Sequence, residues 1–578
     1  MTRTKSVFAA LLLAAIANII PQAQAQTVKV ALAGSSAMWQ SMALAAYNAN
    51  KCVSGGTAPC HHYTSGSNFN LADGRPTTKS GGTTAVDTGS VWIVWDSAAT
   101  PNVWTYIKVD SGVGDRCYFA QPHCNINITS FPSSGNLISA TLWGDDSSDT
   151  TPPANVMALF TSGTLLVNTA ATDIRPEDAM FATCRANSAL GGGPDGLAGL
   201  GYGVNASGTC PGFGATLADL EGADIKSAYP SSTSTAHLLA FNITGKDPFT
   251  GTAIPAYSTV SVGAAPIVFI TQRTGALKTV TNATDAELHA AFGGSNCNAS
   301  AFGAASANIQ VYLREPVSGT MNTTEYTVFR YKDFLGTSQE TGVGAENPLQ
   351  KPCSSGGTRY RAIGTGEEVK FVLNSGTNFG TDGIGYTFFS YGNVSSIANN
   401  ANYGYLTLNG IDGIFHKYGT TIDPGQPATA GELPSNANLP ASCAGNFPCA
   451  EGKIWSGNLS FPNLRNGSYR AWSTLRVVSN GTALTAAQLL VTAAQTYVVN
   501  TVPDFVPALK VAATDPGLSL LRSHYTQEGI APVNVAAAGD RGGDAGGCIL
   551  SNTGTNTTSD TTTKLAQEAP GSSCVVVP

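Results

Sequence analysis

The stretch IQVYLREPVSGTMNTTEYTVF, residues 309–329, decides the expected fold. Its first five residues predict a strand, Arg314 follows directly, and Ser318, Gly319 and Thr320 open a predicted helix that runs to the end of the stretch. A strand that passes through a turn into a helix is a building block of α/β folds. The first turn of a helix has unpaired backbone N–H groups that can bind an anion, and a glycine lets the anion come close to the backbone. An arginine side chain offers an oxyanion two hydrogen-bond donors. The stretch therefore favours an anion site, although a capped helix beside a solvated arginine fits the same residues.

Two further turns have a similar character. The Gly-Ser-Ser turn at 34–36 lies between a strand predicted over 27–33 and a helix predicted over 38–48. Asp173 stands in a third turn, before a proline and acidic residues typical of a first helical turn. A carboxylate accepts a hydrogen bond from hydrogen phosphate, which carries a proton, and repels sulfate, which carries none. Three turns of this kind could converge on one anion, while an N-cap role for Asp173 stays open.

Composition excludes several classes of protein. Charged residues make up 12% of the 578 residues, against roughly 25% in an ordinary soluble domain. Hydrophobic residues still make up 42%, which excludes disorder of the charged, apolar-poor kind. Beyond the N-terminus no unbroken apolar stretch is long enough for a membrane span, so a polytopic membrane protein is excluded. The net charge of −7 argues against nucleic acid as a partner.

The N-terminus and the cysteines predict export. Residues 1–25 combine a basic start, an apolar run and an Ala-Gln-Ala cleavage site, as in a secretory signal peptide. The 12 cysteines are then expected to form disulfides, and the absence of CxxC spacing disfavours a metal site. The simplest pairing is sequential: Cys52–Cys60, Cys117–Cys124, Cys184–Cys210, Cys297–Cys353, Cys443–Cys449 and Cys548–Cys574.

The segment 77–161 has a different character from its surroundings. Residues 91–110 predict two strands around a Pro-Asn turn, and further strands are predicted at 117–120 and 137–143. We therefore expect a β-rich insertion over 77–161. Beyond it, a buried strand is predicted over 264–271.

The order of motifs resembles the periplasmic phosphate-binding proteins that feed ABC-type phosphate importers. The motifs that carry the resemblance span most of residues 27–510, and REPVSGT and the Gly-Ile-Gly-Tyr segment are the most specific. They are AGSSAM (33–38), ATDIRPED (171–178), REPVSGT (314–320), DGIGYTFFSYGN (382–393) and SYRAWSTLRVV (468–478).

The resemblance implies a two-lobe α/β fold of the type II periplasmic-binding-protein kind. After the signal peptide, the first lobe would comprise residues 26–260 with the inserted segment, and the second lobe residues 261–410. Residues 411–538 would return to the first lobe, and residues 539–578 would form a Gly/Thr/Ser-rich tail closed by a disulfide. The strand at 468–478 would be the one by which the chain returns.

The resemblance also implies a ligand set for phosphate. It comprises Ser36, Ala37, Met38, Asp173, Arg314, Ser318, Gly319 and Thr320, with Ser65 or Ser67 as the nearest match to a further serine ligand. The chain departs from the family at Ala37, where a threonine is usual, and Ser36 is expected to supply that hydroxyl.

The predicted function is capture of phosphate or a related oxyanion between the lobes by a periplasmic or secreted monomer, without a cofactor or a metal, for ABC-type uptake. One alternative is a structural or adhesive surface protein that keeps the scaffold and has lost the ligand. A secreted hydrolase is the third possibility, but the chain has no G-x-S-x-G, S-x-x-K or H-E-x-x-H motif. We therefore predict a protein that is not an enzyme.

Overall fold

A computed structural model describes the lobes of the molecule. The described residues are 26–49, 59–72, 88–144, 148–174, 209–210, 215–216, 256–272, 274–315, 317–329, 350–362, 364–373, 382–390, 403–414, 461–465, 469–500, 504–508, 520–521, 547–549 and 574–575.

The first lobe is built on one mixed sheet. Its strands are β1 (Thr27–Gly34), β2 (Cys60–Ala72), β3 (Thr88–Asp96), β4 (Asn102–Lys108), β5 (Asn125–Asn127) and β6 (Thr169–Thr172). Their order is β6-β1-β4-β3-β2-β5, and β1 runs parallel to both β4 and β6. Strands β3 to β5 of the segment 77–161 therefore extend the sheet of the first lobe.

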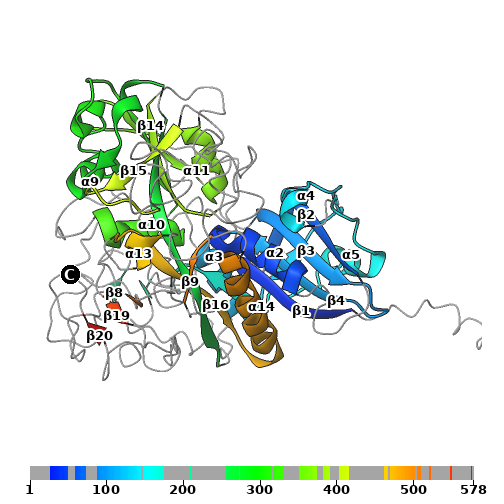
Figure 1. The fold of residues 1–578 in the computed structure, drawn as a ribbon. Coiled ribbons are helices and arrows are strands. Elements are labelled where there is room, and N and C mark those ends of the chain that lie inside the picture. The colour runs from blue at the N-terminus through cyan, green and yellow to red at the C-terminus, as the bar shows by residue number, and fades with distance from the viewer. Residues whose placement is uncertain are drawn as a thin grey trace, which may run out of the picture.

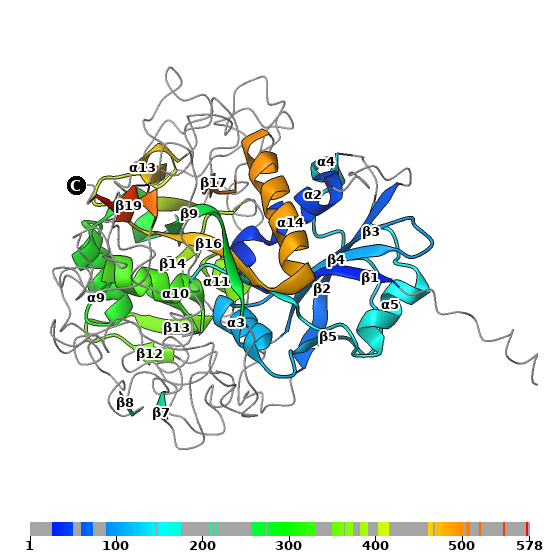
Figure 2. The same cartoon turned by 90° about the horizontal axis from the view of Figure 1, so that it is seen from below.

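Helices cover both faces of this sheet. They are α2 (Trp39–Ala49) and α14 (Gly481–Asn500) on one face, and α3 (Ser111–Phe119) and α5 (Ala154–Thr161) on the other. Along β1, Val30 and Leu32 point into the core with α2 and α14, whereas Ala31 and Ala33 point into the core with α3 and α5. This alternation follows from the two-residue period of a strand. Figures 1 and 2 show α14 beside α2.

The second lobe has its own set of strands and helices. They are β9 (Ser258–Gln272), β11 (Gln310–Arg314), β12 (Gln350–Pro352), β13 (Thr358–Ala362), β14 (Gly383–Phe388), β15 (Tyr403–Leu408), α9 (Asp285–Gly293), α10 (Gly319–Thr324) and α11 (Gly364–Val372). The order is β12-β13-β11-β14-β9, with β15 also paired to β9. Strand β11 is parallel to β13 and β14. On β14, Tyr386 packs against Phe292 of α9 and Gly385 faces Val372 of α11, so these helices lie on opposite faces.

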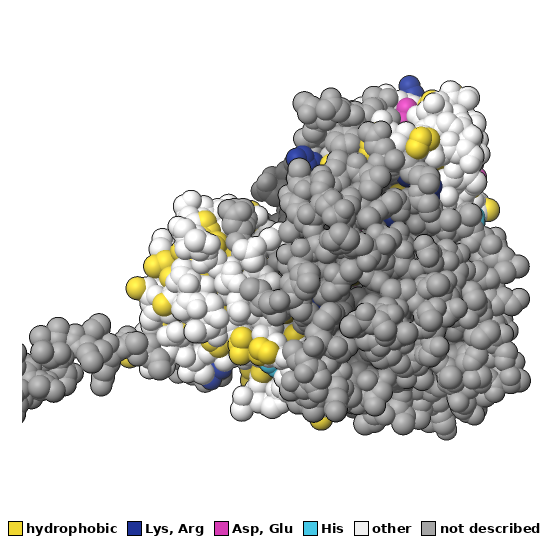
Figure 3. All heavy atoms as spheres, turned by 180° about the vertical axis from the view of Figure 1, so that it is seen from behind, with side chains coloured by type: hydrophobic (Ala, Val, Ile, Leu, Met, Phe, Trp, Pro, Cys, Tyr) yellow, Lys and Arg dark blue, Asp and Glu magenta, His cyan; other side chains and the backbone are white. Residues whose placement is uncertain are grey.

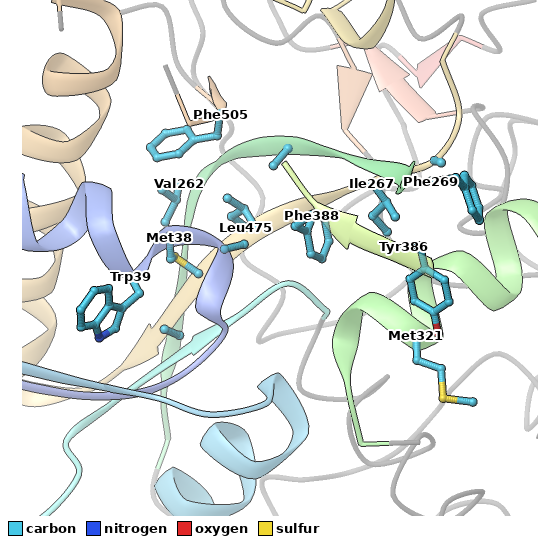
Figure 4. Close-up of a cluster of buried hydrophobic side chains, with 14 of the residues drawn as sticks. Met38, Trp39, Val262, Ile267, Phe269, Met321, Tyr386, Phe388, Leu475 and Phe505 are labelled. Atoms are coloured by element: carbon cyan, nitrogen blue, oxygen red, sulfur yellow. The ribbon is translucent and has the colours of Figure 1, made fainter. Parts of the chain in front are cut away.

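Two strands connect the lobes. The first part of β9 pairs with β16 (Trp472–Ser479), and its last part pairs with β14. The change of partner occurs next to Pro266, where Ile267 donates its N–H to Ala471 at 2.6 Å. Figure 4 shows Ile267, Phe388 and Leu475 packed together along this crossing. The predicted two-lobe α/β fold is confirmed, and β16 is the return strand.

Several sequence predictions of local structure are confirmed. The strands at 27–33 and 309–313 and the helix at 38–48 are present, each within one residue of the expected bounds. The strand at 264–271 is also present, as the last part of β9, which begins six residues earlier at Ser258. The helix that begins at Gly319 continues as a π-helix over Glu325–Phe329.

The strands predicted at 117–120 and 137–143 are wrong. Residue Cys117 belongs to α3, which packs on β1 so closely that a Cβ on Gly114 would come within 2.3 Å of the Ala33 carbonyl oxygen. The second segment ends in helix α4 (Ala140–Trp143), which stops at Gly144 with φ +79°. Tertiary packing and a left-handed C-cap override the local β propensity at these two places.

Two of the predicted disulfides are present, Cys117–Cys124 and Cys297–Cys353. Cys548 and Cys574 face each other in the ladder of β19 (Gly547–Ile549) and β20 (Cys574–Val575). The two disulfides are typical of a protein from an oxidising compartment. Cys60 is disulfide-bonded, and its predicted partner Cys52 lies outside the described residues. Also outside the described residues are Cys184, Cys443 and Cys449, the segment 1–25, the helix expected after Asp173 and most of the tail 539–578.

Helix α14 is, among the described residues, the one helix long and apolar enough to cross a membrane by length and composition alone. One of its sides packs on α2 and β9 in the first lobe. On the face of the molecule drawn in Figure 3, charged side chains are sparse over the described surface, as expected from the 12% charged composition.

Candidate functional site

Strand ends from both lobes meet at one place. In the first lobe the parallel strands β1, β4 and β6 are followed by Ser35, by Asp110 with Ser111, and by Asp173. In an α/β sheet, the loops at the carboxyl ends of parallel strands gather at the edge where ligands bind. We call the side chains that meet here the interlobe cluster. Its members are Ser35, Ser36, Asp110, Ser111, Asp173, Arg314, Glu315, Ser318, Gly319, Thr320, Thr365 and Glu368.

Asp173 lies at the centre of the first lobe's contribution. Its carboxylate accepts hydrogen bonds from the hydroxyls of Ser35, at 3.3 Å, and Ser111. Its N–H donates to the Ser111 Oγ at 3.2 Å, and its carbonyl accepts from the Ser473 hydroxyl of β16. Burial raises the pKa of Asp173 above its usual range, more than the Ser111 hydrogen bond and the Arg314 charge lower it. The side chain is therefore fixed in position and holds a proton more readily than an exposed aspartate.

The N-terminus of α10 in the second lobe packs directly on this carboxylate. A Cβ on Gly319 would lie 1.6 Å from the Asp173 Oδ1, so no other residue type fits there without movement. Beside it, Gly112 of α3 donates its N–H to the Val317 carbonyl at 3.1 Å. The glycine of the Ser-Gly-Thr turn is thus needed for contact between the lobes.

Arg314 is buried and its donors point to named acceptors. Its Nε and Nη2 donate to the two Glu315 carboxylate oxygens, at 3.1 Å and 2.9 Å. Nη2 also donates to Asp110 Oδ1 at 2.5 Å, and Nη1 donates to the Thr365 Oγ1 at 2.8 Å. The contact with Asp110 joins the two lobes, since Asp110 follows β4 and Arg314 ends β11.

Three carboxyl groups surround this one guanidinium, and their pKa values diverge. Burial, followed by the charge of Glu315, raises the pKa of Asp110 well above its usual range. Burial also raises the pKa of Glu368. For Glu315, burial alone would raise the pKa, but the Arg314 charge and hydrogen bonds from Asp110 and Arg314 together lower it. Glu315 is therefore the ionised partner of Arg314, and the other two carboxyls hold protons more readily.

The loop after β1 adds a second contact between the lobes. Ser36 Oγ lies 3.0 Å from Thr365 Oγ1, at the start of α11. Ser35 caps the following turn by accepting the Ala37 N–H at 3.3 Å, and Ala37 and Met38 are buried in the core. Ala37 and Met38, which the resemblance names as ligands, thus follow Ser36 directly in this turn.

Most of the predicted site residues lie together. Ser36, Asp173, Arg314 and Gly319 make the contacts given above. Ser318 caps α10 by accepting the Met321 N–H at 3.3 Å, and Thr320 is buried in the same turn.

Ser65 lies elsewhere. Its ladder partner is Val91 of β3, Val91 pairs with Ile107 of β4, and Ile107 pairs with Ala33 of β1. Three strand spacings of about 4.8 Å therefore put Ser65 about 14 Å across the sheet from β1. The side chain of Ser67 lies outside the described residues, so its role stays a prediction.

The Asp173 carboxylate accepts from Ser35 and Ser111, and the sequence interpretation named neither of these serines as a site residue. It missed Asp110, Glu315, Thr365 and Glu368 as well. The signal for Ser111 is present in the sequence, because Asp-Ser-Gly at 110–112 follows a strand and precedes a helix, as Gly-Ser-Ser does at 34–36. Because this segment was interpreted as an insertion, the sequence analysis did not consider that β4 could be the parallel neighbour of β1.

No group of three or more His, Cys, Asp or Glu side chains among the described residues could hold a metal ion. The cluster instead offers hydroxyls, helix N-termini, one guanidinium and proton-accepting carboxylates. These groups can hold a small oxyanion that carries a proton.

No family model and no curated protein matches the chain. Among solved structures, it is similar to PstS from Borrelia burgdorferi, with a TM-score of 0.29 and 10% identity over 82% of this chain and 96% of that one. It is also similar to an ancestral soluble variant of the human phosphate binding protein, with a TM-score of 0.33 and 11% identity over 85% and 96% of the two chains. A phosphate ABC transporter substrate-binding protein with bound phosphate from Clostridium perfringens gives a TM-score of 0.26 and 16% identity over 44% and 72%. TM-scores this low carry no conclusion about the ligand.

Proposed function

We propose that the chain captures phosphate or a closely related oxyanion between its two lobes, outside the cytoplasm, and delivers it to an ABC-type importer. The observation that carries the proposal is the meeting of Asp173 with the Ser-Gly-Thr turn, through Gly319, beside Arg314. One lobe supplies the proton acceptor and the other supplies the cation and the helix N-terminus. A protonated oxyanion needs both groups.

Binding then requires the lobes to separate and close again. Every member of the interlobe cluster apart from Ser36 is buried or lies in a buried turn, so an anion reaches Arg314 only when the contacts of Arg314 with Asp110 and of Ser36 with Thr365 are broken. The two crossing strands near Pro266 and Ala471 are where the lobes can hinge. Closure would surround the anion with fixed donors and exclude water.

Specificity follows from Asp173. Its carboxylate can accept a hydrogen bond from the proton of hydrogen phosphate and faces sulfate with like charge, and its neighbours Ser35 and Ser111 fix its orientation. We infer binding without chemical conversion of the ligand, because the cluster holds the anion between fixed donors and the hydroxyls of Ser35 and Ser111 serve to orient Asp173.

The direct test is calorimetric titration with phosphate and with sulfate. We expect heat with phosphate and none with sulfate. Arg314→Lys keeps the charge and loses the fork, so phosphate affinity should fall by about 10-fold to 100-fold. Arg359→Lys is the matched control, since Arg359 is also buried and its Nη1 donates to the Phe292 carbonyl of α9. No heat with either anion in the unmutated, folded protein would overturn the proposal.

One observation favours the alternative of a surface protein that has lost its ligand. Arg314 is already engaged by Glu315, Asp110 and Thr365 of the chain itself. On that alternative, denaturation of the purified protein releases no phosphate and titration gives no heat. Release of about one phosphate per chain on denaturation would exclude it.

A further inference from the structure

Asp110 occupies a helix N-cap position without capping its helix. Aspartate at an N-cap usually accepts an N–H from the first helical turn. In α3 the Asp110 side chain makes no such hydrogen bond. Its carboxylate is directed instead across the boundary between the lobes, to Arg314 Nη2 at 2.5 Å. The residue thus forgoes a local contact and makes a contact between lobes.

The donors of Arg314 explain what this contact does. Glu315 belongs to the same loop as Arg314 and takes Nε and one position on Nη2. Thr365 takes Nη1 from the same lobe. Among the described residues, Asp110 is the first-lobe carboxylate with a hydrogen bond to Arg314, and Asp173 is close enough for the Arg314 charge to lower its pKa. An oxyanion held by Arg314 and Asp173 together would meet the Asp110 carboxylate already bonded to the same guanidinium and would compete with it for Nη2.

We propose that Asp110 is a competitor for the anion built into the fold. Its carboxylate closes the lobes on Arg314 when no anion is present and weakens anion binding by occupying the same donor. The claim that Asp110 closes the lobes without a ligand stands on the Asp110–Arg314 contact alone. The claim that Asp110 weakens anion binding rests on the proposed function.

The competition depends on pH because the Asp110 carboxyl can be protonated, and charged groups around it influence that protonation. The groups that face it are Arg314 and Glu315 after β11 and Asp173 after β6, with Glu368 of α11 behind Arg314. Protonation of Asp110 removes its negative charge and leaves a weaker acceptor for Arg314. Competition is therefore strongest at high pH and weakest at low pH.

The test compares Asp110→Asn with Asp96→Asn. Asparagine keeps the shape and an acceptor oxygen but has no charge, and Asp96 lies in the β3–β4 turn at the opposite end of the first lobe. Calorimetry with inorganic phosphate at about pH 8 should give roughly 10-fold tighter binding for Asp110→Asn, and a smaller gain at about pH 5. Small-angle scattering of phosphate-free protein should give a larger radius of gyration for Asp110→Asn. Asp96→Asn should match the unmutated protein in both measurements.

The outcomes separate this inference from the proposed function. If the unmutated protein binds phosphate and Asp110→Asn binds it no more tightly, competition is wrong and the function stands. If neither protein binds phosphate, the function is wrong and scattering decides the rest. A larger radius for Asp110→Asn then supports closure by Asp110, and an unchanged radius overturns it. Asp110→Ser, which keeps an N-cap residue, repeats the test if the asparagine variant does not fold.

Discussion

Asp149 and Asp173 of the first lobe both have buried side chains, and both accept hydrogen bonds from hydroxyl groups. Asp149 accepts from His62 at 3.0 Å, from the Thr64 N–H at 2.9 Å, and from Ser134 at 2.7 Å. His62 and Thr64 belong to β2, and Ser134 lies between β5 and α4, so these partners of Asp149 all lie within the first lobe. Asp173, in contrast, contacts the second lobe through Gly319.

Because their environments differ, the pKa of Asp149 is lowered and that of Asp173 is raised. Burial by itself raises the pKa of each. Around Asp149, hydrogen bonds from His62, Thr64 and Ser134 outweigh burial and lower the pKa. Around Asp173 burial outweighs the hydrogen bonds and the pKa is raised. A carboxylate completed within one lobe stabilises that lobe, whereas one left with spare acceptor capacity at the boundary is suited to a proton-bearing ligand.

The largest expected effect is on the free energy of unfolding, from removal of the Asp149 carboxylate. His62 stacks on Trp143 at 4.1 Å and bonds Asp149, so Asp149→Ala leaves a buried imidazole and several donors without an acceptor. We expect a loss of about 3–5 kcal/mol in the free energy of unfolding, measured with urea. Phosphate affinity of the folded fraction should not change.

Asp96→Ala is the control for this prediction. Asp96 also accepts from Ala98 and Asn102, but in a partly exposed turn. Its loss should cost about 1 kcal/mol or less. Equal losses for Asp149→Ala and Asp96→Ala would contradict the structural role assigned to Asp149.

The next largest effect is on phosphate affinity, from a substitution at the contact between the lobes that leaves each lobe folded. Gly319→Ala places a Cβ on the Asp173 carboxylate, so the lobes cannot close as observed. Phosphate affinity should fall by about 100-fold, which corresponds to about 2.7 kcal/mol, with little change in unfolding. Gly366→Ala in α11 is the matched control, since no heavy atom lies within 4 Å of its added Cβ. Equal affinities for the two variants would show that Gly319 does not define the site.

The sequence predicted the parts of the site that follow local rules. A strand, an arginine and Ser-Gly-Thr at a helix start appear in consecutive residues, so Arg314, Ser318 and Gly319 could be recognised together. Asp173 was recognised because a carboxylate in an anion site is favourable only when the ligand carries a proton that can donate a hydrogen bond to it. These arguments need only the order of residues along the chain.

The rest depends on which strands become neighbours. The hairpin of β2 and β3 separates α2 from β4 in the chain, and nothing local states that β4 returns to lie parallel to β1. Ser111 therefore reaches Asp173 through sheet order, which also puts Ser65 three strands away. The contact of Asp110 with Arg314 joins residues 204 positions apart and depends on how the lobes meet. Such contacts could not be predicted from motifs.

The smallest expected effect tests the opposite titration of the two aspartates. A lowered pKa means that Asp149 stabilises the folded protein above the unfolded pKa, and this contribution is lost as the pH falls through the folded pKa. A raised pKa means that Asp173 costs stability as the pH rises from the unfolded pKa through the folded pKa. From about pH 2 to about pH 4, the stability of Asp149→Asn should therefore fall relative to the unmutated protein, and from about pH 4 to about pH 7 that of Asp173→Asn should rise.

Urea unfolding of phosphate-free protein at several pH values measures both slopes, with changes of the order of 1.4 kcal/mol for each pKa unit. Slopes of the same sign would mean that Asp173 is satisfied as completely as Asp149. It would then keep no acceptor capacity for a proton from the ligand, and discrimination against sulfate would have to come from another group. Opposite slopes together with binding of sulfate by Asp173→Asn would connect the raised pKa to ligand selection, because one substitution would remove both properties.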